Sequence, residues 1–427
     1  MPKESKHIGG TGHKNLVIFI VEGPADELAL KIAFQRLYDK IDQNIQVEFI
    51  NVKGDITTEE NTFNIENDLE DLLQSNRAIL EQIKAYPERT LIIQIVDLDG
   101  VFIDNNLIVI DRKSVEQIND TIKYEDNRIA CLSQSHRNYI VNTRNPDKRN
   151  NLIQLSIKNS IRLRKINHSV SYAMYYFSTN LEHFLPIRNP NYGSGKKEYA
   201  KFFAQTEYRI IEKFVSYFVN DPESATQRKM SREESWKFIR QRGTTNSLAR
   251  GTNLDLLLKN LYLEASLANA IKAFEEQIIY SYEIGTKSGL CSIHQALYKD
   301  LAPLAGQTNI NLTNIEKMPE TDFASITQKF IEMLKTHPFS IGNGQAIRIW
   351  YDMMLKNKLS IIIAWDKIKV EKYLTAIERL SKTDQPLKSL LKDATTRKTD
   401  DKKVIIDGLK QSYCFEGFDP KTAISIS

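Results

Sequence analysis

The chain has 427 residues, of which 41% are hydrophobic and 26% are charged, a composition typical of a soluble globular protein with two or three domains. It contains no run of about 18 apolar residues, so we expect no membrane-spanning segment. The net charge of +4 says little about partners, and three distant cysteines without a CxxC pair exclude a disulfide framework and a thiolate zinc site, which fits a cytoplasmic protein.

Residues 1–14 are polar, contain glycine and lack the apolar segment of a secretory signal, so we expect a flexible N-terminal tail. Short apolar runs rich in β-branched residues follow at 16–21, 47–52 and 91–96. Their continuous apolarity predicts strands buried on both faces, as in a parallel sheet. Helical spacing from Pro24 onward and over 67–86 separates the runs. The order strand-helix-strand-helix-strand predicts a doubly wound α/β sheet flanked by helices.

Residues 101–170 contain polar loops and a helical pattern at 112–122, so we interpret them as an insertion. A fourth strand is predicted at 172–177, with a helix from about Leu181. Beyond 195 helical patterns dominate, at 196–219, 231–241, 253–282, 321–335, 345–357 and 366–381. We therefore expect an α/β domain over 15–195 and a mainly helical domain over 196–427, for substrate binding, dimer formation or docking of a partner.

Acidic residues follow two of the predicted strands. Glu22 comes directly after the first run, and Asp97 and Asp99 come directly after the third. Ligands of open parallel sheets bind beyond the carboxyl ends of the strands. Residues at positions i and i+2 of an extended chain point to the same side, so Asp97 and Asp99 are expected to converge on one ion. Neighbouring carboxylates repel one another, and the oxygen ligands favour Mg²⁺ or Mn²⁺ over zinc.

Further candidates surround these acids. Asp26 and Glu27 lie one turn beyond Glu22 and are candidates for a second ion, although they also suit the start of a helix. Lys53 follows the second strand, where it would stabilise charge on a phosphate.

Between residues 144 and 165 seven basic residues accompany a single acid. This run predicts either a solvated helix face or a surface that binds the phosphate backbone. Its members are Arg144, Lys148, Arg149, Lys158, Arg162, Arg164 and Lys165.

The motifs VEGPADE (21–27), Lys53-Gly54-Asp55 and VDLDG (96–100) together resemble the TOPRIM domain. This domain is shared by topoisomerases, bacterial primases, small maturation ribonucleases and OLD-type nucleases. The resemblance covers about residues 15–100. It implies that Glu22, Asp97 and Asp99 hold Mg²⁺.

A second segment, YFSTNLEHFL (176–185), is similar to a motif of TOPRIM-like proteins of bacterial phage defence, among them the RloB-like abortive-infection proteins. In that motif a glutamate opens a helix beside the metal site, and this chain lacks the tryptophan that normally follows. The resemblance implies that Glu182 is a fourth catalytic acid. A glutamate in the first turn of a helix also suits the helix dipole without any catalytic role.

The sequence therefore predicts a metal-dependent endonuclease that hydrolyses phosphodiester bonds of DNA or RNA, tRNA included, in an anti-phage system. Its expected partners are nucleic acid and, as options left open, a partner ATPase and a second copy of the chain. The alternative is a TOPRIM-like regulatory or interaction subunit that a partner ATPase holds inactive. The sequence shows no tyrosine in a recognisable nucleophile context, which argues against a topoisomerase. It also shows no zinc-binding module, which argues against a primase.

Overall fold

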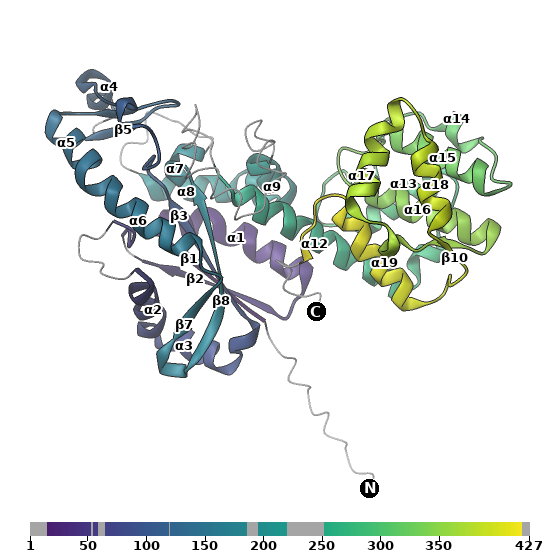
Figure 1. The fold of residues 1–427 in the computed structure, drawn as a ribbon, viewed down its shortest axis with the longest axis horizontal. Coiled ribbons are helices and arrows are strands. Elements are labelled where there is room, and N and C mark those ends of the chain that lie inside the picture. The colour runs from purple at the N-terminus through teal and green to yellow at the C-terminus, as the bar shows by residue number, and fades with distance from the viewer. Residues whose placement is uncertain are drawn as a thin grey trace, which may run out of the picture. The chain divides into compact units, whose positions relative to one another are not determined.

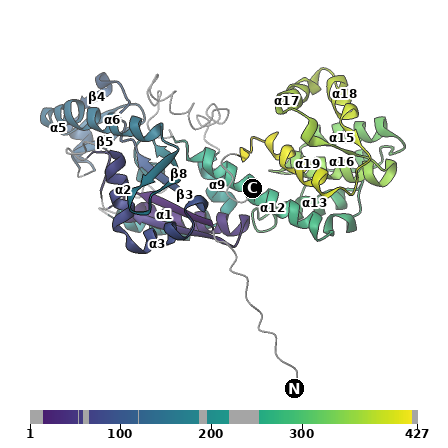
Figure 2. The ribbon, with the colours of Figure 1, turned by 60° about the horizontal axis from the view of Figure 1, so that its bottom comes forward.

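The computed structural model describes residues 15–52, 54–58, 65–118, 120–185, 195–219 and 252–420, with only the backbone described for Glu182 and His183. These residues form two compact units, one ending at Leu258 and the other beginning at Lys259 (Figures 1 and 2). The expected tail 1–14, Lys53 and the expected helix 231–241 lie outside the described residues.

A five-stranded sheet forms the centre of the first unit, in the order β2-β1-β3-β8-β7. The first four strands in this order run parallel, and β7 pairs with β8 in the antiparallel direction. The α/β class and the parallel pairing of the predicted strands are thereby confirmed, whereas the edge strand β7 was not predicted. The strands are β1 (Asn15–Val21), β2 (Ile45–Asn51), β3 (Thr90–Asp97), β7 (Ser160–Leu163) and β8 (His168–Phe177).

Helices cover both faces of this sheet because alternate residues of each strand point to opposite sides. On one face, Ile18 of β1 belongs to a core that includes buried residues of α2, α3 and α6. On the other face, the ring of Phe19 packs on that of Phe34 in α1 at a centroid distance of 4.5 Å. The helices are α1 (Pro24–Ile41), α2 (Ile65–Ser75), α3 (Arg77–Ala85) and α6 (Asn145–Ser156).

The single helix expected at 67–86 is two helices, α2 and α3, because Asn76 begins a new helix between them. The Asn76 side chain accepts a hydrogen bond from the backbone N–H of Ile79 at 3.2 Å, which is the geometry of a helix N-cap.

The insertion builds a small sheet of its own, in the order β4-β6-β5. Its strands are β4 (Ile108–Ile110), β5 (Ile122–Tyr124) and β6 (Ile129–Cys131), and α4 (Arg112–Glu116) lies between the first two in sequence. The helix expected at 112–122 is therefore too long. After β6, α5 (Gln134–Tyr139) continues through a π-helical turn (Ile140–Arg144) into α6. In this turn the N–H of Asn145 donates to the carbonyl of Ile140, five residues back.

The expected domain boundary near residue 195 is too early. Helices α8 (Lys196–Gln205) and α9 (Ile211–Val219) belong to the first unit, which ends at Leu258. Phe214 of α9 is fully buried, and its ring lies 6.0 Å from those of Phe34 in α1 and Phe203 in α8. A change to helical periodicity marks a change of secondary structure but does not show which core a helix joins. The short helix α7 (Leu181–Phe184) follows β8.

The second unit is helical, as expected for this part of the chain, and none of its described helices or those of the first unit is long and apolar enough to cross a membrane. Helix α12 (Leu254–Glu275) contains the division between the units. The later elements are α13 (Lys287–Tyr298), α14 (Thr313–Glu316), α15 (Phe323–Thr336), α16 (Asn343–Leu359), β9 (Ile362–Ile363), α17 (Val370–Glu378), α18 (Gln385–Asp393), β10 (Thr395–Thr396) and α19 (Lys402–Cys414).

The place of α9 in the first core can be tested by substitution. We expect Phe214→Ala to lower the free energy of unfolding of the first unit by about 3–5 kcal/mol, because it leaves a cavity among aromatic rings. The half-exposed Phe202 of α8 provides the control, and Phe202→Ala should change stability by less than about 0.5 kcal/mol. Hydrogen exchange measured on peptides from β1 and α16 reports the two units separately. Loss of protection in α16 but not in β1 would contradict the assignment.

Candidate acidic site

Two predicted acids lie side by side at the carboxyl edge of the sheet. Strands β1 and β3 are parallel neighbours, so Glu22, which follows β1, lies next to Asp97, the last residue of β3. The backbone N–H of Asp97 donates to Oε1 of Glu22 at 2.9 Å. This bond fixes the Glu22 carboxylate across the two strand ends.

Asp99 reaches the same region by a turn rather than by strand alternation. Strand β3 ends at Asp97, and Asp99 and Gly100 both adopt left-handed backbone conformations, with φ of 50° and 64°. The backbone N–H groups of Asp99 and Gly100 donate to the carbonyls of Thr179 and Ser178 at 3.0 and 2.8 Å, which holds the turn against the end of β8. The expectation that Asp97 and Asp99 share one side of an extended chain is therefore wrong in its geometry.

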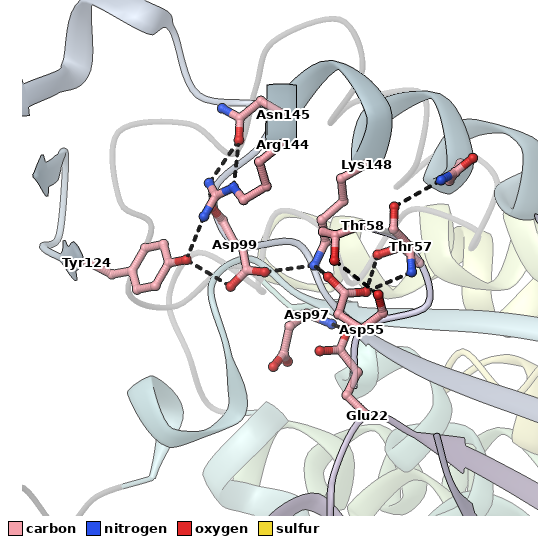
Figure 3. A network of polar contacts seen from close by, with 11 residues as sticks. Glu22, Asp55, Thr57, Thr58, Asp97, Asp99, Tyr124, Arg144, Asn145 and Lys148 are labelled. Atoms are coloured by element: carbon pink, nitrogen blue, oxygen red, sulfur yellow. Dashed lines mark hydrogen bonds and ion pairs between the residues drawn. The ribbon is translucent and has the colours of Figure 1, made fainter. Parts of the chain in front are cut away.

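A buried lysine enters this acidic cluster from α6. The Nζ atom of Lys148 lies 2.7 Å from Oδ2 of Asp99 and also forms an ion pair with Asp55. Its side chain is 0% exposed, whereas those of Asp55 and Asp99 are 18% and 20% exposed. Figure 3 shows the Lys148 ammonium between Asp55 and Asp99, with Glu22 and Asp97 beside them. The sequence prediction that Lys148 binds a phosphate backbone at the surface does not agree with this burial.

Asp55 is a member of the cluster that sequence reasoning missed. It lies in the loop after β2, where its Oδ1 accepts a hydrogen bond from the N–H of Thr57 at 2.9 Å. Helix α6 secures this loop, because the Asn151 side chain donates to the carbonyl of Thr57 at 3.0 Å. The signal was present in Lys53-Gly54-Asp55, since acids that follow parallel strands of one sheet lie at the same edge of that sheet.

The insertion supplies the other side of Asp99. The hydroxyl of Tyr124, at the end of β5, donates to Oδ1 of Asp99 at 2.9 Å. Arg144, the last residue of the π-helical turn, donates to the Tyr124 oxygen at 3.1 Å and to the Asp99 carbonyl at 2.9 Å. π-Helical turns occur often at functional sites. Sequence reasoning missed Tyr124 and placed Arg144 on a solvated helix face or a surface that binds the phosphate backbone, whereas Arg144 is buried.

Burial and neighbouring charges shift the protonation of this cluster. Burial raises the pKa of the Glu22 carboxyl well above its ordinary value; Lys148 acts against this shift, and Asp55 and Asp99 add to it. Burial would also raise the pKa of Asp99, but Lys148 and Arg144 outweigh it and hold that pKa below its usual value. Burial lowers the pKa of Lys148, yet Asp99, Glu22 and Asp55 more than reverse this, so the ammonium stays charged. The cluster therefore contains a positive charge at neutral pH.

The remaining predicted acids have structural partners. Oδ2 of Asp26 accepts a hydrogen bond from the N–H of Gly23 at 2.7 Å, which caps α1. Glu27 forms an ion pair with Lys31 at 2.8 Å and accepts a hydrogen bond from Asn51. These contacts explain both residues without a second metal ion. Lys53 and the side chain of Glu182 lie outside the described residues, so their predicted roles stay predictions.

The basic run 144–165 does not form one surface. Arg144 and Lys148 are buried, and the guanidinium of the partly exposed Arg149 donates to the carbonyl oxygen of Val101. The other members belong to the segment that leads from α6 through β7 to the start of β8, and the start of β8 lies at the opposite end of the sheet from Asp97. Two of them, Lys158 and Arg164, pair with Glu66 and Glu70. Arg162 and Lys165 are exposed there, away from the acids. Counting charges along the chain could not reveal this separation.

No known family model matches the sequence. Among the described residues, no three His, Cys, Asp or Glu side chains stand in an arrangement ready to hold a metal ion. The chemistry of the cluster nevertheless suits Mg²⁺ or Mn²⁺, because its acids offer carboxylate oxygens and two of them, Asp55 and Asp99, already bind one cation, the Lys148 ammonium. Glu22, Asp97 and Asp99 stay the predicted ligands of such an ion.

The role of Tyr124 in holding Asp99 can be measured. We expect Tyr124→Phe to lower the free energy of unfolding by about 1 kcal/mol, because Asp99 and Arg144 each lose a hydrogen bond in a partly buried site. Tyr139 of α5 is 47% exposed, and Tyr139→Phe is the matched control, with no expected change. Urea unfolding of the three proteins provides the comparison. Equal stability of the Tyr124 variant and the wild type would contradict this role.

Proposed function

We propose that this chain is a TOPRIM-type nuclease that hydrolyses phosphodiester bonds with Mg²⁺ or Mn²⁺. The observation that carries the proposal is the pairing of Asp55 and Asp99 with a buried ammonium, beside Glu22 and Asp97, at the carboxyl edge of a mainly parallel sheet. Ligands of α/β sheets bind at this edge. Such a concentration of carboxylates is costly unless cations bind there.

In this proposal Glu22, Asp97 and Asp99 hold the ion. When bound, it lowers the pKa of a water molecule and neutralises charge on a non-bridging phosphate oxygen. The protein orients the ligands: the Asp97 N–H fixes Glu22, and Tyr124 fixes Asp99. Arg144 adds fixed positive charge behind Asp99, where it also favours an approaching phosphate.

Two unsatisfied polar groups near Asp99 support the presence of a ligand or ordered water. Asn145 Nδ2 and Thr179 Oγ1 are buried, and they have no hydrogen-bond partner within the part of the chain that the structure describes. Buried polar groups are nearly always paired, by water where not by protein. Asn145 also accepts hydrogen bonds from Arg144 through its Oδ1 atom, so its amide lies in the same network as Asp99.

The proposed substrate is nucleic acid, either DNA or RNA. A role in cytoplasmic anti-phage defence rests on the resemblance of residues 176–185. One observation favours the alternative of a subunit held inactive by a partner ATPase: Lys148 already supplies a cation to the acids. The two functions predict different behaviour of the purified chain.

Incubation with plasmid DNA and with total tRNA tests the proposal. We expect cleavage of one substrate with Mg²⁺ or Mn²⁺ and none with EDTA. Asp97→Asn should reduce the rate at least about a hundredfold, because it removes a charged ligand of the ion. The exposed Asp126 of the insertion provides a control, and Asp126→Asn should cleave at the wild-type rate.

Two results would count against the nuclease. Cleavage that persists in Asp97→Asn would point to a contaminating enzyme or to a different site. No cleavage of either substrate, with a partner ATPase that co-purifies with the chain, would favour the regulatory subunit.

A further inference from the structure

We infer that Lys148 is the resident cation of the acidic cluster and competes with a divalent ion for Asp99, so that metal binding requires Lys148 to release this carboxylate. The inference deepens the proposed function and rests on its metal site. It says which cation, the Lys148 ammonium or a divalent ion, binds Asp99 at that site.

Lys148 contacts one of the three carboxylates of the proposed metal site, that of Asp99. Its Nζ atom lies 2.7 Å from Oδ2 of Asp99 and contacts Asp55 from the same position. Both acids keep about a fifth of their side-chain surface exposed, whereas Lys148 has none. Ions in solution can therefore reach the carboxylates, but the oxygen of Asp99 that faces the cluster interior is occupied.

The other oxygen of Asp99 is also engaged. Oδ1 accepts a hydrogen bond from the hydroxyl of Tyr124 at 2.9 Å, and Arg144 binds the backbone carbonyl of the same residue. Each carboxylate oxygen has two lone pairs, so an ion that binds Asp99 lies beside Lys148 at Oδ2 or beside Tyr124 at Oδ1. Displacement of Lys148 is favoured by charge, because an ammonium and a divalent cation on the same carboxylate repel each other.

The same contacts explain how the acids tolerate one another when no metal is bound. Without Lys148, Asp55 and Asp99 would face each other and Glu22 in a buried region with no counter-charge from α6. Unpaired buried charges are strongly destabilising. Lys148 thus lets the metal-free site fold, and the cost is a weaker affinity for the ion.

Lys148→Met in the full-length chain tests the competition, with Lys158→Met as the matched control. Lys158 belongs to the same basic run but pairs with Glu66 and is about one-third exposed. Mn²⁺ is the probe, and its binding is measured by titration calorimetry and by the electron paramagnetic resonance signal of free Mn²⁺. We expect Lys148→Met to bind Mn²⁺ at least about tenfold more tightly than the wild type, and Lys158→Met to bind as the wild type does.

Thermal unfolding gives a second readout. In EDTA, Lys148→Met should unfold at a lower temperature than the wild type, and Mn²⁺ should restore more stability to the variant than to the wild type. Unchanged or weaker Mn²⁺ binding by Lys148→Met would overturn the inference. So would a failure of both proteins to bind Mn²⁺.

If Lys148→Met does not fold, the double variant Asp55→Asn/Lys148→Met takes its place. It removes one negative and one positive charge together, so the net charge of the cluster stays that of the wild type. Glu22, Asp97 and Asp99 remain without a competing ammonium, and Mn²⁺ should again bind more tightly than to the wild type. Equal or weaker binding by this variant would overturn the inference.

These outcomes are distinct from those of the nuclease test. Tighter Mn²⁺ binding by the variants, with no cleavage by the wild type, would retain the Lys148 competition and reject the nuclease. Metal-dependent cleavage by the wild type, with no gain of Mn²⁺ affinity in the variants, would retain the nuclease and reject the competition.

Discussion

The ion pairs of Lys148 with Asp55 and Asp99 are the interaction on which the acidic site depends. The three residues come from different parts of the first unit: Asp55 from the loop after β2, Asp99 from the turn after β3, and Lys148 from α6. A fully buried ammonium has no solvent to replace a lost partner, so it constrains these three segments to one geometry. Removing one partner would leave an uncompensated charge. The loop after β2, which α6 also secures through Asn151, therefore takes its position from the same helix that supplies the ammonium.

The position of Lys148 depends in turn on the helix before it. From α5 to α6 the chain is continuously helical, but the hydrogen bond of the π-helical turn Ile140–Arg144 spans five residues instead of the four of an α-helix. It ends at Arg144, which binds the Asp99 carbonyl, and Lys148 follows four residues later. Residues four apart lie on the same face of an α-helix. The two cations therefore face Asp99 together, one at its backbone and one at its carboxylate.

The sequence predicts those residues of the site that local patterns reveal. It does not predict those that join the site through contacts between distant parts of the chain. Glu22 and Asp97 can be located because a buried strand followed by an acid is a local pattern, and parallel neighbours end at the same edge. Asp55 carried the same signal in weaker form. Lys148 and Tyr124 could not be assigned, because 49 and 25 residues separate them from Asp99 in the chain and no periodicity links such positions. The basic run was misread for the same reason: charge density along a sequence does not distinguish a buried lysine from a solvated one.

The sequence correctly places Asp99 in the acidic cluster, although the extended-strand geometry used for that prediction is wrong. The alternation of an extended strand would place Asp97 and Asp99 on one side, but β3 ends at Asp97 and a left-handed turn follows. That turn is stable because three successive N–H groups, from Leu98 to Gly100, find carbonyl partners at the end of β8. An aspartate tolerates the left-handed region better than most residues, and a glycine adopts it freely. The Asp-Leu-Asp-Gly sequence therefore suits a turn that points its second acid back across the strand ends, toward the helix that carries Lys148.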